Sequence, residues 1–115
     1  MKKEKFSYSL NSADGKAILA ALPLVLIYSE IVYSDAQYEI NARVGQSVME
    51  KLLNGKADFL PNEIRIMGCA VFIAYDVLRG DLPLDLTDEE RNAITPYLFT
   101  YNKLYPIFEQ YFPDR

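Results

Sequence analysis

The chain has 115 residues, a formal net charge of −4 and an apolar content of 50%. This length and composition are those of one globular domain with one hydrophobic core, and they exclude a disordered chain. The acidic balance argues against a general nucleic-acid-binding protein, which needs an excess of Lys and Arg to displace counterions from phosphates.

Histidine is absent and Cys69 is the single cysteine. A Ser-His-Asp or Cys-His catalytic site therefore lacks its base, and zinc sites built from His and Cys lack their ligands. No intramolecular disulfide can form, so nothing indicates an oxidising compartment. We expect a cytoplasmic protein without a metal or cofactor, in which Cys69 is a buried, unreactive thiol.

The N-terminal segment 1–11 contains an alternation of apolar and polar residues that is typical of a short strand. No clear second strand is available to pair with it, so an extended arm is an equally good interpretation and the one we adopt. A helix is predicted to begin after it, near Ser12 or Asp14. Pro23 lies inside this helix, which therefore either kinks there or restarts with proline in its first turn.

The same predicted helix carries an uninterrupted apolar run, Ala17–Tyr28. A membrane span needs about 18 apolar residues or more, and the acid Glu30 follows the run almost immediately. A secretory signal is a second interpretation, because lysines precede the run. The stretch before it is long, however, and includes the acids Glu4 and Asp14. We predict a buried helix and no membrane association.

The clearest amphipathic helix is predicted over residues 35–53. Ser34 and Gln37 have the spacing of a capping box, and the Asn-Gly pair at 54–55 is a helix stop. Gln37 and Asn41, one turn apart on the apolar side, are expected to form a hydrogen-bonded core pair, with a polar-ligand site as the alternative. The predicted buried face consists of Ile40, Val44, Val48 and Leu52.

A third helix is predicted over residues 61–79, with a narrow polar strip. The acids Glu30 and Asp76 lie within apolar stretches, and two buried carboxylates can act as an acid/base pair. Such acids more often neutralise an arginine, and Arg79 lies three residues from Asp76. The alternative function for the chain is therefore a small-molecule-binding or enzymatic pocket using these two acids together with Arg65.

The last helical region is predicted from a capping box at Thr87 and Glu90 to residue 112, with interruptions near Pro96 and Pro106. Its apolar residues recur on one helical face, which indicates core. This stripe consists of Tyr97, Tyr101, Leu104, Tyr105, Phe108, Tyr111 and Phe112. The whole chain, 1–115, is thus predicted to be a single all-α domain, a compact bundle of about four helices with a short extended N-terminal arm.

Two apolar residues of the last helix, Phe99 and Ile107, fall on its polar face beside Lys103. Exposed aromatic anchors mark interfaces, although the N-terminal arm could instead cover this face. Residues 81–90 contain five acidic residues and no Lys or Arg. They could dock a basic surface, or they could form a solvated loop and a well-capped helix. The predicted partner-binding residues are Phe99, Ile107, Lys103, Asp81, Asp85, Asp88 and Glu89.

The function predicted from these features is protein–protein contact without catalysis, by a small acidic helical protein of the inhibitor, immunity or adaptor type. A homodimer is a further expectation. Two nearly all-apolar helices carry more apolar surface than one small domain can bury, and a second copy would cover the remaining apolar surface.

Overall fold

The protein is an all-α bundle, as predicted, and the structure is a computed structural model that describes residues 11–32, 34–56 and 58–111. Within this described part of the chain no strand occurs. The elements are α1 (Ser12–Val32), α2 (Asp35–Leu53), α3 (Pro61–Arg79), α4 (Asp88–Ile94), the 3₁₀ helix η1 (Thr95–Tyr97) and α5 (Leu98–Glu109). The predicted N-terminal arm lies outside the described residues, apart from Asn11.

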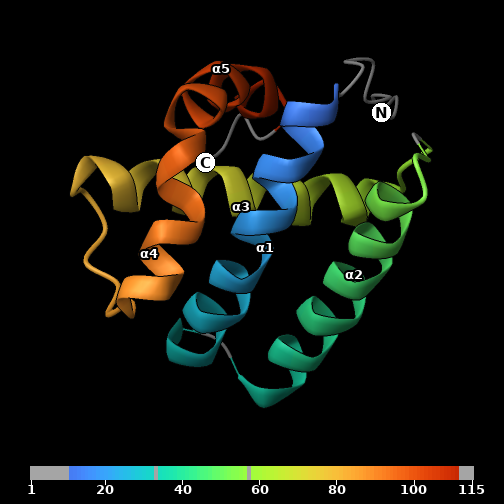
Figure 1. Ribbon diagram of the computed structural model, residues 1–115. Helices are drawn as coiled ribbons and strands as arrows, with labels where there is room; N and C mark the ends of the chain where they lie inside the picture. The colour runs from blue at the N-terminus through green and yellow to red at the C-terminus, as the bar shows by residue number, and fades with distance from the viewer. Residues whose placement is uncertain (1–10, 33, 57, 112–115) are drawn as a thin grey trace.

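An antiparallel pair, α1 and α2, forms one layer of the bundle (Figure 1). Helix α3 crosses behind this pair and packs against both of its members. Helix α4 lies on the other side of α1 from α2, and α5 packs on α3 near the start of α1. The first and last helices of the chain are therefore neighbours.

Local capping interactions set the ends of α1 and α2. The Asn11 side chain accepts a hydrogen bond from the Asp14 N–H at 2.8 Å, and the Asp14 carboxylate accepts one from the Asn11 N–H at 3.1 Å. This reciprocal capping box starts α1 at Ser12. The Ser34 hydroxyl accepts from the Gln37 N–H at the start of α2, whose predicted bounds are confirmed.

The ends of α3 and α4 also follow sequence signals. Helix α3 has the predicted bounds and ends at Gly80, which adopts a left-handed conformation with φ of 81° that glycine tolerates best. Thr87 and Glu90 form the predicted capping box at the start of α4, through hydrogen bonds of 3.1 and 2.8 Å.

Pro23, Pro96 and Pro106 have different effects on the helical segments in which they lie. Pro23 lies inside one continuous α1, and Pro106 lies inside α5 without ending it. Pro96 lies in η1, where the backbone tightens between α4 and α5. The predicted last helix is therefore two helices that meet at Pro96, because proline lacks the N–H that would continue the helical ladder.

The hydrophobic core lies where α1, α3 and α5 meet. Most of the predicted aromatic stripe belongs to it: Tyr101, Leu104 and Phe108 are fully buried, and Tyr97 and Tyr105 pack against the core. Tyr111 is half-buried, and Phe112 lies outside the described residues. The Tyr101 hydroxyl donates a hydrogen bond to the carbonyl of Ala17 in α1 at 2.7 Å. The radius of gyration, 13.4 Å, is about that expected for a compact chain of this length.

The predicted buried face of α2 is wrong at one end. Val48 is buried and Val44 and Leu52 are half-buried, but Ile40 is 50% exposed. Helix α2 lies at the edge of the bundle, so its first turns have less of the molecule to pack against (Figure 1). Cys69 is half-buried rather than buried.

Candidate protein-interaction surfaces

Phe99 is the most exposed large apolar side chain of the described residues, with 85% of its surface accessible. It lies in the first turn of α5, on the face opposite the buried stripe. Its neighbour Leu98 is 39% exposed, and Pro96 of η1 is exposed as well. The predicted exposure of Phe99 is confirmed, and the junction of α4 and α5 presents apolar surface to solvent.

The predicted exposure of Ile107 is wrong, because its side chain is half-buried and packs against the core. At about 100° per residue, Ile107 lies roughly 100° from the buried stripe of α5, whereas Phe99 lies about 180° from it. A residue at the border of the buried face of a helix can be covered in part by the elements that pack on that face. Ile107 is therefore not an equal partner of Phe99.

Lys103, the third residue predicted on this face, is held by the protein's own ion pair. Its ammonium lies 2.7 Å from the carboxylate of Asp14, which is fully buried, while 44% of the Lys103 side chain is accessible. A lysine that neutralises a buried acid is not free to be the anchor of a partner. Its contribution to binding another protein is therefore limited to its exposed part.

The four acids of residues 81–90 that were predicted to bind a partner are exposed but not equivalent. Asp81 lies 3.5 Å from the guanidinium of Arg79, and both side chains are about half exposed, so its charge is partly compensated. The remaining predicted acids are exposed, with Asp85 in the loop before α4 and Asp88 and Glu89 in its first turn. These three give the start of α4 a negative surface and also favour the helix N-terminus.

Glu30, Asp76 and Arg65, the residues of the predicted pocket, line neither of the two hollows that the structure has along α1 and α2. Glu30 and Arg65 are exposed and Asp76 is half-buried. Glu30 was expected to be buried because of its apolar neighbours in sequence, but it lies in the last turn of α1, where the helix reaches the edge of the bundle (Figure 1).

Sequence reasoning missed the burial of two acids, Asp14 of α1 and Glu63 of α3, and Glu63 is 2% exposed. Its carboxylate accepts hydrogen bonds from the Leu60 N–H at 2.7 Å, from Lys51 at 2.8 Å and from the Ser47 hydroxyl. Burial alone raises the pKa of Glu63, but these hydrogen bonds and the charge of Lys51 together hold the pKa below its ordinary value. Its position three residues after Leu60, the N-cap of α3, was the available signal.

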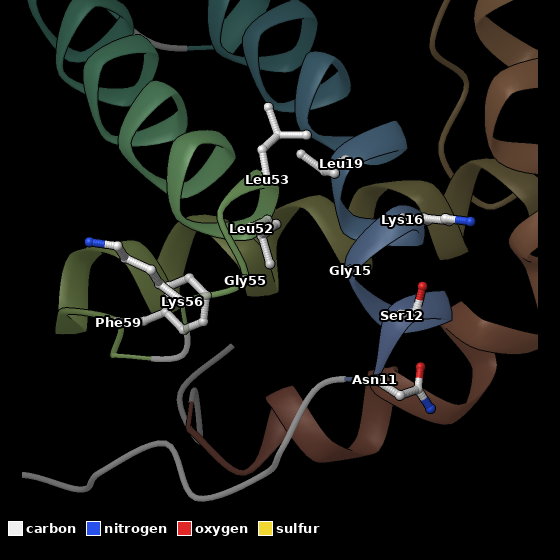
Figure 2. Close-up of a pocket in the computed structure, with 10 residues that line it drawn as sticks. All are labelled: Asn11, Ser12, Gly15, Lys16, Leu19, Leu52, Leu53, Gly55, Lys56 and Phe59. Carbon is white, nitrogen blue, oxygen red and sulfur yellow. The ribbon is translucent and has the colours of Figure 1, made fainter.

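Two hollows lie along the face of the α1–α2 pair, and Leu19 lines both of them. The larger, of about 410 Å³, lies where α1 begins and α2 ends, and Figure 2 shows its lining residues coming from the two helices and the following loop. Lys16 and Lys56 are its charged residues. The smaller hollow, of about 180 Å³, is mainly apolar and includes Pro23 and Gly45.

Helix α1 is the one described helix that is long and apolar enough to cross a membrane, with a mean hydropathy of 1.7 over its most apolar stretch. Only a third of that stretch is buried in the molecule. Core helices of soluble proteins pass the same test of length and composition, and α1 packs against α2, α3, α4 and α5.

No protein family, curated protein or solved structure shows significant similarity to this chain.

Proposed function

We propose that the protein acts by binding another protein through the outer surface of α4 and α5, in the manner of an inhibitor, immunity protein or adaptor. The observation that carries this proposal is the 85% exposure of Phe99. When a partner covers an exposed phenyl ring, the burial of its apolar surface stabilises the complex. Such aromatic rings are the anchors of protein interfaces.

The proposed partner offers an apolar pocket for this ring, bordered by basic side chains. The exposed acids Asp85, Asp88 and Glu89 form the polar rim on this protein. Rim charges of this kind mainly raise the rate of encounter, so association should slow as the salt concentration increases. Leu98 and Pro96 extend the apolar centre next to Phe99.

We propose no reaction for the protein, and we infer that it works in the cytoplasm without a cofactor. Among the described residues, Asp14 and Glu63 are the fully buried acids. The carboxylate of each accepts a hydrogen bond from a lysine and one from a backbone N–H at the start of a helix. This arrangement supports a structural role for both carboxylates. The single cysteine supports the choice of a reducing compartment.

The test is a pull-down from cells with wild-type protein and two variants that each remove one exposed apolar side chain. Phe99→Ser should lose a specific partner that wild type captures. Leu53→Ser, at a residue that is 68% exposed on α2 and lines the larger hollow, outside the proposed surface, is the matched control and should retain it. Retention of that partner by Phe99→Ser, in a variant that is still folded by circular dichroism, would overturn the proposal.

A further inference from the structure

A second surface, the outer face of the α1–α2 pair, carries an inference that is independent of Phe99. On α1 this face is a single row of residues spaced three or four apart, which places them on one side of the helix. The row consists of Lys16, Leu19, Pro23, Leu26 and Glu30. Its middle is apolar, while its two ends carry exposed charges of opposite sign.

The same polarity occurs on α2, which runs antiparallel to α1. Lys56, which follows the end of α2, lies with Lys16 at the larger hollow. Asp35, the first residue of α2, is exposed near the end of α1, where Glu30 lies. The face therefore has a basic end and an acidic end, separated by the residues that line the smaller hollow, which are apolar or small except for Asn41 and Gln46.

Such a face is complementary to the same face of a second copy that is rotated by 180°, so that each basic end meets an acidic end. In a two-fold arrangement with the axis across the helices, α1 lies antiparallel on α1 of the partner copy, and α2 on α2. Lys16 then meets the Glu30 position of the second copy, and Lys56 meets the Asp35 position. The sequence midpoint of the first pair is Pro23, and that of the second lies between Gly45 and Gln46. All three residues line the same hollow.

Gly45 supplies an independent argument for close approach at this axis. A glycine inside a helix destabilises the helix relative to alanine, so glycine at this position calls for an explanation. A Cβ atom added to Gly45 would meet nothing within 4 Å, so the packing of the monomer does not require glycine there. A second backbone crossing at this position would require it, since small residues let helices come close together.

We propose that the protein forms a two-fold homodimer through the α1–α2 face, with Pro23 and Gly45 at the axis and Lys16–Glu30 and Lys56–Asp35 pairs at the ends. The second copy covers apolar surface of α1, of whose most apolar stretch only a third is buried within one chain. The dimer leaves α4 and α5 free for the proposed partner.

The test is the solution mass measured by light scattering behind a sizing column, from about 1 μM to about 1 mM, the range of weak specific complexes. Wild type should approach twice the chain mass of 13.2 kDa as its concentration rises. Lys16→Glu and Glu30→Lys should each weaken association at least about tenfold, because each places like charges together twice in a two-fold dimer. The double variant Lys16→Glu/Glu30→Lys should associate like wild type, since it restores both pairs.

Two further variants separate this surface from others. Gly45→Arg should remain folded, because its side chain enters open space, and should be a monomer. Arg91→Glu, an equal charge change on exposed α4, and Phe99→Ser should leave the dimer intact. A monomer at every concentration would overturn the proposal and leave the face to another occupant, such as residues 1–10. If wild type forms a dimer but the double variant Lys16→Glu/Glu30→Lys does not, the dimer uses another surface.

Discussion

The ammonium of Lys103 in α5 lies 2.7 Å from the carboxylate of Asp14 in the first turn of α1, and the carboxylate is fully buried. The pair joins two helices whose residues are 89 positions apart in the chain. Lys103 therefore neutralises a buried carboxylate, although part of its own side chain is exposed on the outer face of α5.

Replacing Lys103 with Met should lower the free energy of unfolding by about 2 kcal/mol, because a buried carboxylate then loses a charged hydrogen-bond donor. Urea denaturation measures this loss. Asp14→Asn combined with Lys103→Met should cost less than the sum of the two single changes, since both remove the same interaction. Strict additivity would show that the two residues do not stabilise each other.

Glu63 should make stability depend on pH. Its folded-state pKa lies below the ordinary value of 4.5, so the ionised carboxylate stabilises the fold above that pH. This contribution is lost as the pH falls through the folded-state pKa. Glu63→Gln should therefore cost about 1–2 kcal/mol at pH 7, and much less near pH 3.

Urea denaturation at the two pH values measures this difference. Glu39→Gln, at an exposed position of α2, is the matched control and should change stability little at either pH. An equal loss of stability for Glu63→Gln at both pH values would contradict an ionised, hydrogen-bonded Glu63.

The Tyr101 hydroxyl should contribute through one hydrogen bond to Ala17. Burial raises the pKa of Tyr101 far above its ordinary value, so the hydroxyl stays protonated and remains a donor. Tyr101→Phe should lower the free energy of unfolding by about 1 kcal/mol. Tyr97→Phe, at a half-buried position, is the comparison, and thermal unfolding of the two variants should rank Tyr101→Phe as less stable.

Phe99 and Phe108 should differ in their contributions to stability although they lie in the same helix. Phe108 is fully buried, and Phe108→Ala should cost about 3–5 kcal/mol through the cavity that it leaves. Phe99→Ala should change stability by less than about 0.5 kcal/mol, as surface substitutions do. A large loss for Phe99→Ala in urea denaturation would mean that the ring is part of the fold and unavailable to a partner.

The boundaries of most helices could be predicted because their signals are local. Ser34 at the start of α2 and Gly80 at the end of α3 act on backbone atoms a few residues away, and the aromatic stripe of α5 follows from helical periodicity. The same reasoning found Phe99, which lies directly opposite that stripe.

What could not be predicted depends on partners far away in the chain. The burial of Asp14 and Glu63 needs Lys103 and Lys51, which lie 89 and 12 residues away. The exposure of Ile40 depends on α2 lying at the edge of the bundle, which helical periodicity does not reveal. The hollows between α1 and α2 likewise arise only when the two helices are packed.

The neighbouring positions of α1 and α5 also determine the order in which the chain can fold during synthesis. Tyr101 bonds to a carbonyl 84 residues earlier, so this contact can form only after Tyr101 has been synthesised and has left the ribosome. At about 5–20 residues per second, several seconds separate the synthesis of α1 from that of α5. During this interval α1 lacks the part of its packing that α5 provides, and its apolar face is more open to chaperones and to aggregation.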